Sequence, residues 1–514
     1  MGQQPAGLPA ALPTSSNNHS PCSSTPKRIH TPMQTISTQL LVLGGGPGGY
    51  AAAFLAADRG FQVTLVDASG KFGGTCLQVG CIPSKALLHV AKLIGEAKDA
   101  PHFGVTFGPP KIDLKGVRGH WQKVTETLTK SLAKLAESRK IRFIHGKGKF
   151  LDAHTVVVDD GTQITFEHAI IATGSRPLIP PLSGLDSFPY LTTDSVWELS
   201  SDPGRVLVLG GGPVGCELSQ SLARLGCHVT LAHSADRLLS RDDVEASGVL
   251  VRALAASGVV VKLATAVTSV AREATGTFLA STTTGSIAFD TLLLATGRQA
   301  NFEGIGLKQA GISTMANGPS VKGFDGIRVD AYLRTSNDRV FAVGDCVAAA
   351  PRFTHAADAM ARLAVRNALI ATQWPFGLLL GAIWAPHLIP WCTWTDPEVA
   401  GVGEINPPGA TLHKIDLENN DRHALEESGP GWLKIWTDKK GMISGASICG
   451  RGAGELIGIV ALAMREGWPL KKLSGWIVPY PSRNQALSRA GDSAARQALT
   501  PAVSAWLRWW LGKC

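Results

Sequence analysis

A chain of 514 residues is long enough for about three domains, because single hydrophobic cores seldom grow past roughly 250 to 300 residues. Its apolar share of 44 % and charged share of 17 % are those of a globular protein, and no apolar run supplies the ~20 clean residues of a transmembrane segment. The net charge of +9 is spread along the chain without a clustered Lys/Arg run, so the sequence predicts no nucleic-acid partner.

The first 36 residues contain no acid and are rich in Ser, Thr and Pro. An organelle transit peptide would normally carry more Arg, and a secretory signal would need a longer apolar core. Because Met33 leads directly into the first apolar strand, we expect residues 1–36 to be a disordered extension. The nine cysteines form no secreted disulfide framework, so a reducing, cytoplasmic compartment is expected.

The first ordered segment has the pattern of a dinucleotide-binding fold. A strand expected at 39–43 runs into a glycine-rich turn, an Ala-rich helix follows, and a second strand at 61–66 ends at Asp67. Glycines allow the tight turn and the close approach to a pyrophosphate, and an acid at this distance can bind a ribose hydroxyl. The glycines in the required places are Gly44, Gly46 and Gly49.

The next segment, 73–85, reads GGTCLQVGCIPSK and holds two cysteines, Cys76 and Cys81. A regular helix would separate their Cα atoms by ~8.7 Å, whereas a disulfide needs less than about 7 Å. The backbone must therefore leave the helix between them, and Gly80 and Pro83 allow this. A bridge over so small a loop stabilises little, and no second Cys/His pair suggests a metal, so the spacing favours a redox couple and no metal site.

The dinucleotide pattern then repeats. A strand at 205–209 leads into a second glycine-rich turn, and the strand after its helix ends at His233, at the offset where the first module has Asp67. Losing that carboxylate removes the repulsion of a 2′-phosphate, and Arg237 and Arg241 are near in sequence, so NADPH is permitted beside NADH. Alternatively, His233 points to solvent. The glycines of this turn are Gly210, Gly212 and Gly215.

Three further turns follow apolar strands. Two read Ala-Thr-Gly, one with Thr173 and Gly174 and the other with Gly297. A later strand ends in Gly344 and Asp345, where a carboxylate can meet a polyol while glycine lets the backbone approach a phosphate. Each turn by itself is usually an ordinary strand end. Only their order along the chain makes them evidence for a nucleotide-binding fold.

Taken in that order, the motifs resemble the pyridine nucleotide-disulfide oxidoreductases, a flavoprotein family that includes dihydrolipoamide dehydrogenase and mercuric reductase. The resemblance covers almost all of residues 38–500. The first half resembles dihydrolipoamide dehydrogenase, and the second half, with 353–358, 395–398 and 499–501, is similar to the mercuric-reductase-like branch. The resemblance implies an α/β fold with two Rossmann-like domains, binding FAD and NAD(P), and a C-terminal α+β domain that forms a homodimer.

The implied domains are the extension at 1–36, the FAD-binding domain at 37–190 and 291–385, the NAD(P)-binding domain at 191–290 and the dimerisation domain at 386–514. The resemblance places FAD on Gly44, Gly46, Gly49, Asp67, Lys85, Thr173, Gly174, Gly344 and Asp345. It places the nicotinamide cofactor on Gly210, Gly212, Gly215, His233 and Gly297.

The resemblance also implies roles for the cysteines. Electrons would pass from NAD(P)H through the flavin to the disulfide, with Cys81 as the thiol beside the flavin and Cys76 as the thiol that meets a small-molecule or protein disulfide or dithiol. Lys85 would lower the pKa of the thiolate, and Glu217 matches the family acid that pairs with such a lysine. For both charges, a plain surface position is the alternative.

The pattern breaks near the C-terminus. Dihydrolipoamide dehydrogenases use a His-Glu pair from the partner subunit as the base for thiol chemistry, and here Tyr480 and Gln485 stand in those places. A model tyrosine titrates near pH 10, so dithiol oxidation should suffer by about 10² to 10⁴. Mercuric reductases carry a vicinal cysteine pair near the C-terminus, and this chain has only Cys514 there. Three readings stay open: a dihydrolipoamide dehydrogenase-like enzyme, a metal reductase or diaphorase, and an impaired flavoprotein with a structural role.

Two apolar stretches stand outside these motifs. The run 376–391 is interrupted by Pro386 and Pro390, so we expect buried core or loop. The tail 506–511 clusters three tryptophans, which could meet a membrane surface or a partner, and packing within the dimer is the simpler expectation.

Overall fold

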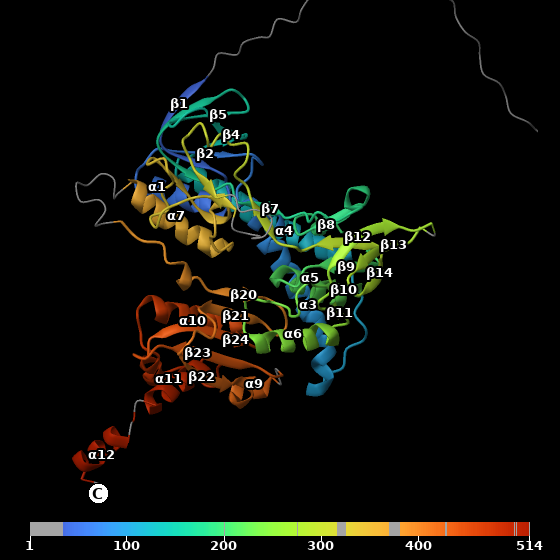
Figure 1. Ribbon diagram of the computed structural model, residues 1–514, viewed down its shortest axis with the longest axis vertical. Coiled ribbons are helices and arrows are strands. Elements are labelled where there is room, and N and C mark those ends of the chain that lie inside the picture. Colours follow the sequence, from blue (N-terminus) through green and yellow to red (C-terminus); the bar gives the residue numbers. More distant parts are fainter. Residues whose placement is uncertain are drawn as a thin grey trace, which may run out of the picture.

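The computed structural model describes residues 34–199, 201–274, 276–315, 325–369, 381–426, 429–497, 499 and 501–512. The expected extension therefore lies outside the described residues up to position 33, and so does Cys514. Its last residues are not an extension, because they belong to the first strand: Ile36 is buried and pairs with Ile164. The described chain folds into three sheet-containing units and a separate C-terminal helix (Figure 1).

The first unit is a sheet in the order β3-β2-β1-β6-β5-β4, and β19 pairs with the end of β6 on the edge opposite β1. Strands β1, β2, β3, β6 and β19 run parallel, and β4 and β5 add an antiparallel edge. Helices α1 and α7 pack together, and the alanines of α1 allow this close approach. The bounds are β1 Thr35–Leu43, α1 Pro47–Ala57, β2 Val63–Asp67, α2 Gly74–Val79, α3 Cys81–Asp99, η1 Ala100–Phe103, α4 Leu114–Ser138, β3 Arg142–His145, β4 Gly148–Phe150, β5 Thr155–Val158, β6 Gln163–Ile171, β19 Val340–Ala342, η4 Gly344–Cys346 and α7 Thr354–Leu369.

The second unit is a five-stranded parallel sheet in the order β11-β10-β9-β15-β8, joined by a three-stranded antiparallel sheet, β12-β13-β14. Strand β15 pairs with β9, so the second sheet extends four residues beyond the expected domain boundary at 290. The bounds are β8 Tyr190–Thr192, η3 Val196–Glu198, β9 Arg205–Leu209, α5 Pro213–Arg224, β10 His228–Ala232, α6 Val244–Ala256, β11 Val260–Lys262, β12 Val267–Arg272, β13 Phe278–Thr282, β14 Gly285–Phe289 and β15 Thr291–Leu294. Two short antiparallel strand pairs stand apart from these sheets. They are β7 Ser175–Pro177 with β16 Arg298–Ala300, and β17 Thr314–Met315 with β18 Gly326–Ile327.

The third unit is a five-stranded antiparallel sheet in the order β20-β21-β24-β23-β22, packed against helices α10 and α11. The outer strand β22 is mostly exposed, and strands β23 and β24 are almost entirely buried. The bounds are η6 Pro386–Leu388, β20 Trp391–Thr393, β21 Val399–Gly403, β22 Thr411–Asp416, η7 Leu417–Asn419, α9 Asp421–Leu425, β23 Trp432–Thr437, β24 Ile443–Cys449, α10 Ala453–Arg465, η8 Leu470–Gly475, α11 Gln485–Gln497 and α12 Pro501–Trp510. This architecture confirms the predicted α/β class with a C-terminal α+β unit.

The second and third units share a polar contact in a buried position. Lys434 on β23 is only 5 % exposed, and its Nζ donates to both carboxylate oxygens of Asp243, at 2.9 and 3.0 Å, and to Glu245 at 2.8 Å. Asp243 also caps α6 by accepting from the backbone of Glu245. A buried ammonium is tolerated when it is paired and hydrogen-bonded in this way, so this contact fixes the third unit against the start of α6.

The apolar run at 376–391 lies partly outside the described residues, which resume at 381. From 381 to 390 the backbone forms only an irregular segment and the short turn η6, so the loop expectation holds for this part. Within the described part of the chain, no helix is both long and apolar enough to span a bilayer.

Candidate active site

The two cysteines lie on different helices that meet at one glycine. Helix α2 ends at Val79, Gly80 has φ −128° and ψ −109°, and α3 begins with Cys81. A Cβ atom on Gly80 would lie 2.9 Å from the carbonyl oxygen of Thr75 and 3.2 Å from the Cα of Cys76, so a side chain does not fit. The predicted departure from helix between the cysteines is confirmed.

The two thiols lie near disulfide distance and share one hydroxyl. Thr354, at the start of α7, has its Oγ1 3.0 Å from the sulfur of Cys76 and 3.2 Å from that of Cys81. A hydrogen bond from Cys76 lowers the pKa of Cys81 to about 6, helped by Thr354 and the charge of Lys85 and opposed by burial. The same hydrogen bond and burial raise the pKa of Cys76. In the reduced pair Cys81 is therefore the thiolate and Cys76 the thiol.

An ion pair between a partly exposed lysine and a buried carboxylate stands one helical turn from Cys81. The Nζ of Lys85 on α3 lies 3.1 Å from Oε2 of Glu217 on α5, and Glu217 is only 3 % exposed. The other oxygen, Oε1, accepts from the backbone N–H of Trp394 at 2.8 Å. The expected Lys85–Glu217 pair thus forms, and the carboxylate joins all three units. Its position beside a flavin remains a prediction.

The residues expected to hold FAD gather at one edge of the first sheet. Parallel strands β2, β1, β6 and β19 are neighbours, and the candidate residues follow their carboxyl ends, which is where open α/β sheets bind ligands. The pairing of Ala342 with Ile171 places Gly344 and Asp345 beside Thr173 and Gly174. Thr173 is held there because its Oγ1 donates to the carbonyl of Asn301 at 2.5 Å.

The glycine-rich turn of the first unit fits a dinucleotide. Gly44 has φ +108°, and a Cβ atom on Gly49 would lie 1.7 Å from its carbonyl oxygen, so packing alone demands glycine at both places. Gly46 differs, because it has an ordinary φ of −74° and its added Cβ would meet only the Cα of Gly74, at 3.8 Å. Space that the protein leaves open at such a glycine suits a pyrophosphate at the start of α1.

Asp67 stands at the end of β2 beside this turn. Its Oδ2 accepts from the backbone N–H of Gly45 at 2.6 Å, and its Oδ1 accepts from the N–H and the hydroxyl of Ser69 at 2.8 and 2.5 Å. These donors hold the carboxylate at the turn, in the place where a ribose hydroxyl would be bound.

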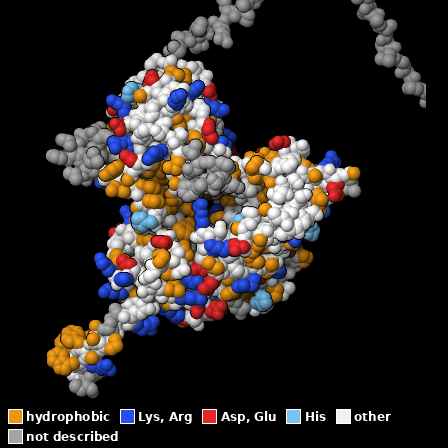
Figure 2. Space-filling model, viewed as in Figure 1, with side chains coloured by type: hydrophobic (Ala, Val, Ile, Leu, Met, Phe, Trp, Pro, Cys, Tyr) orange, Lys and Arg blue, Asp and Glu red, His pale blue; other side chains and the backbone are white. Residues whose placement is uncertain are grey.

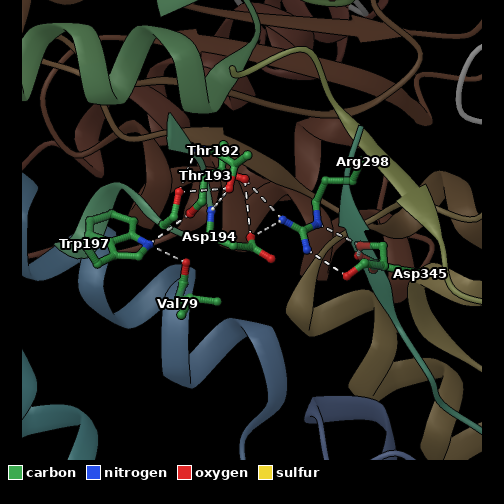
Figure 3. Close-up of polar contacts among 9 residues, drawn as sticks. Val79, Thr192, Thr193, Asp194, Trp197, Arg298 and Asp345 are labelled. Atoms are coloured by element: carbon green, nitrogen blue, oxygen red, sulfur yellow. Dashed lines mark hydrogen bonds and ion pairs between the residues drawn. The ribbon is translucent and has the colours of Figure 1, made fainter. Parts of the chain in front are cut away.

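A polar network, which Figure 3 shows, leads from the first nucleotide edge toward the cysteines. Asp345 accepts a hydrogen bond from the hydroxyl of Ser175 at 2.6 Å, and Arg298 Nε donates to the same hydroxyl at 2.8 Å. The guanidinium of Arg298 also pairs with Asp194 at 2.8 Å. Because Arg298 follows the second sheet and Asp345 the first, this network connects the two nucleotide-binding edges.

The other end of the network reaches the cysteine helices. The indole N–H of Trp197, on η3, points at the carbonyl of Val79 at 2.6 Å and at that of Thr193 at 2.9 Å (Figure 3). Val79 is the last residue of α2, so its carbonyl has no partner within the helix. Trp197 therefore supplies a donor to the end of the helix that carries Cys76.

The second glycine-rich turn repeats the first closely. Gly210 has φ +118°, and a Cβ atom on Gly215 would lie 1.8 Å from its carbonyl oxygen. A Cβ atom on Gly212 would meet no protein atom within 4 Å, so open space again marks the middle glycine. Gly297, at the end of β15, has φ +111° and equally open surroundings. These positions fit a second dinucleotide.

His233 occupies the same place in this unit as Asp67 in the first. Its Nδ1 accepts from the backbone N–H of Gly211 at 3.1 Å, so the alternative that it points to solvent is wrong. Burial lowers the pKa of His233, and the ring is therefore neutral at pH 7. Arg237 donates to the carbonyls of Ser240 and Asp242, at 2.5 and 3.1 Å, while Arg241 is exposed.

Tyr480 does not join the cysteines within one chain. It lies in the third unit ahead of α11, its side chain is 73 % exposed, and no hydrogen bond of the phenol is seen in the described ranges. Gln485 begins α11, and its Oε1 is buried without a partner among the residues that the structure describes. The role of Tyr480 toward a partner subunit remains a prediction.

Sequence reasoning missed two residues of the site. Thr354 appears in a stretch that pointed only to a branch of the family, because nothing in the sequence links it to cysteines 273 and 278 residues away. Trp197 lies in a segment without a motif. No group of three His, Cys, Asp or Glu side chains in the described part of the chain is placed to hold a metal ion.

Comparison with known proteins identifies relatives of this chain. The family model for pyridine nucleotide-disulphide oxidoreductases matches residues 38–361, and that for their dimerisation domain matches 389–490. A dihydrolipoyl dehydrogenase of Buchnera aphidicola subsp. Schizaphis graminum is 32 % identical over 478 residues, covering 89 % of this chain and 96 % of that protein. A mercuric reductase of Streptomyces lividans is 33 % identical over 472 residues, covering 88 % and 95 %. The crystal structure of LpdA from Mycobacterium tuberculosis has a TM-score of 0.78 and 26 % identity, covering 90 % of this chain and all of that one.

Two dinucleotide-type folds together with a half-buried thiol pair define a flavoprotein disulfide reductase. The chain belongs to the pyridine nucleotide-disulphide oxidoreductase family. The family uses FAD and NAD(P)H, and the match to its dimerisation domain indicates a homodimer.

Replacing Thr354 by Ala should raise the pKa of Cys81 above its value of about 6. The hydroxyl stabilises the charged sulfur, so its loss should shift the pKa by about one unit and reduce the thiolate fraction at pH 7 from about nine tenths to about one half. The measurement is the pH dependence of Cys81 alkylation by iodoacetamide in the reduced protein, located by mass spectrometry. Alkylation should fall as the pH drops through about 6 in the parent and about 7 in the variant.

Thr354→Ser is the matched control, because it keeps the hydroxyl and removes only a methyl group. Its alkylation profile should follow that of the parent. An unchanged profile in Thr354→Ala would contradict the assignment of this hydroxyl to the thiolate.

Proposed function

We propose that this protein is an NAD(P)H-dependent reductase that passes electrons through Cys76 and Cys81 to a small disulfide or other small acceptor, and that it turns over dihydrolipoamide poorly. The observation that carries the proposal is the pair of thiols near disulfide distance, both within hydrogen-bond reach of the Thr354 hydroxyl at 3.0 and 3.2 Å, and the lowered pKa of Cys81 agrees with it. FAD and the nicotinamide cofactor, when bound, supply the hydride chemistry. The glycine-rich turns, Asp67 and Asp345 would hold them.

The cysteines can complete a balanced exchange with an organic disulfide. Two electrons and one proton convert the Cys76–Cys81 disulfide to the Cys76 thiol and the Cys81 thiolate. Once Cys76 loses its proton, its sulfur attacks the acceptor disulfide, which forms a mixed disulfide and releases one thiolate. Cys81 then attacks the sulfur of Cys76, which restores the internal disulfide and releases the second thiolate. The low pKa of Cys81 keeps it ready for this last step at neutral pH.

Two alternatives remain for the acceptor. The similarity to a mercuric reductase favours a soft metal ion, and a diaphorase would pass electrons to a quinone without using the cysteines. The hydrogen-bonded thiol pair argues against a flavoprotein that keeps only a structural role, because such a role needs no thiolate.

Cys76→Ser and Cys81→Ser should each reduce the NAD(P)H-dependent reduction of dithiobis(nitrobenzoate) by about a hundredfold or more, since covalent exchange needs both sulfurs. Reduction of a quinone acceptor by the same preparations should persist, which shows that the variants remain folded and loaded with cofactor. Cys81→Ser should also lose the long-wavelength absorption that a thiolate gives beside an oxidised flavin. Disulfide reduction at parental rates in both variants would contradict the thiol route.

Tyr480→His should raise the turnover of dihydrolipoamide by about tenfold or more, because a neutral imidazole can take the proton of the substrate thiol. The variant Tyr480→Phe, which restores no base, is the matched control and should gain nothing. Adding Gln485→Glu to Tyr480→His should increase turnover further by orienting the ring. High dihydrolipoamide turnover in the parent protein would show that the tyrosine is no defect.

For the nicotinamide cofactor, we propose that His233 admits NADPH as well as NADH. A neutral ring at this place presents no negative charge to a 2′-phosphate, whereas a carboxylate held by the same backbone N–H would repel it. The exposed Arg241 adds a positive charge nearby in sequence.

His233→Asp should therefore raise the KM for NADPH by about tenfold or more and change that for NADH much less. His233→Asn is the matched control, because it adds no charge and can still accept from Gly211. The measurement is KM and kcat for both nucleotides in all three proteins. Equal KM ratios in the Asp and Asn variants would contradict a role for charge at this position.

A further inference from the structure

Within the part of the chain that the structure describes, the C-terminal helix α12 makes no extensive contact with another helix or strand. It is a ten-residue helix with none of its residues buried, and it lies apart from the three units, below α11 (Figure 1). The family match to the dimerisation domain ends at residue 490, so α12 lies beyond the part of the chain that this match covers. Helices this short are marginal in water without tertiary contacts, which indicates that something else supports α12.

The helix is amphipathic, and its apolar face is exposed. At about 100° per residue, one face carries most of the large side chains, while Ser504 and Arg508 lie on the other. Trp509 and Trp510 are 71 % and 67 % exposed, and Figure 2 shows hydrophobic side chains gathered on this helix. The rings of Trp506 and Trp510 stack with centroids 6.2 Å apart. The large apolar residues of the helix and its end are Val503, Trp506, Leu507, Trp509, Trp510 and Leu511.

The charges of this segment have one sign. After Asp492 the sequence contains Arg496, Arg508 and Lys513 and no further acid. A two-fold contact between copies of α12 would bring the two Arg508 side chains of a dimer toward each other with no acid of the segment to pair them. One face of a ten-residue helix also offers far less than the ~1,000 Å² of a stable protein interface. A surface with negatively charged groups over an apolar layer would match both the exposed apolar face and the positive charge of α12.

We propose that α12 is an interfacial helix that binds the surface of an anionic lipid bilayer. Trp506, Leu507 and Trp510 enter the boundary between headgroups and acyl chains, and Arg508 meets the lipid phosphates. Tryptophan is enriched at this boundary because its ring is apolar and its N–H needs a polar partner. A homodimer carries two such helices, and simultaneous binding of both strengthens attachment without any new contact. The helix lies on the membrane and does not span it.

Sedimentation of the full-length protein with lipid vesicles tests this proposal. Vesicles of equal parts phosphatidylglycerol and phosphatidylcholine should bind the parent, and vesicles of phosphatidylcholine alone should bind it more weakly. Trp506→Ser/Trp510→Ser should weaken binding by about tenfold or more, and Arg508→Gln by about fivefold. Phe107→Ser is the matched control, because it removes an aromatic ring that is 60 % exposed outside α12, and it should bind like the parent.

Flavin content, NAD(P)H oxidation and sedimentation velocity of each variant report whether the dimer remains folded, and all should match the parent. A chain ending at Leu499 removes α12 entirely and should lose vesicle binding while keeping activity. Two outcomes would overturn the proposal: vesicle binding that persists without the helix, or dissociation of the dimer in Trp506→Ser/Trp510→Ser without any parental binding to vesicles. The second outcome would place the helix in the dimer contact.

Discussion

One buried carboxylate, that of Glu217, contacts all three units of this protein. Glu217 gives one oxygen to Lys85 of the first unit and the other to the backbone of Trp394 in the third, while its own helix belongs to the second. A carboxylate this deeply buried is tolerated only with both partners in place. Because Lys85 stands one helical turn after Cys81, the same constraint positions the helix that begins with the low-pKa thiol.

The thiol pair depends on contacts that converge on it from distant parts of the chain. Thr354 comes from the helix after the last strand of the first sheet, and Trp197 comes from the segment between strands β8 and β9 of the second sheet. One contributes a hydroxyl to the sulfurs, and the other a donor to the carbonyl that ends α2. Gly80 lets the two cysteine helices meet without a side chain between them. The first cause of the low pKa of Cys81 is the hydrogen bond from Cys76 within the thiol segment, and the assembled fold adds the hydroxyl of Thr354, which that segment alone lacks.

Local patterns predicted the strand, glycine-rich turn, helix and strand of both units, because these elements and the terminal polar residue are close in sequence and geometrically linked. The equivalence of His233 and Asp67 followed from an equal offset, and both side chains do accept from the second glycine N–H of their turns. The sequence could not predict Thr354, whose contact spans 273 residues and follows no periodicity. It also placed Ile36 outside the fold, because pairing with β6 at so early a position depends on a strand more than a hundred residues later.

The glycine-rich turns and the thiol pair keep the family pattern, whereas Tyr480 and Gln485 depart from it, and under the function proposed above this asymmetry favours one direction of chemistry. Oxidation of a dithiol requires a group that takes protons, which a neutral imidazole does and a phenol at neutral pH does not. Reduction of a disulfide releases thiolates that need protons, and a phenol can donate one. The high pKa of Cys76 still requires some acceptor for its own proton before attack, and water or the leaving thiolate can serve where turnover is slow. Tyr480 is 73 % exposed, and under the function proposed above a tyrosine at this place favours reducing an acceptor over oxidising dihydrolipoamide.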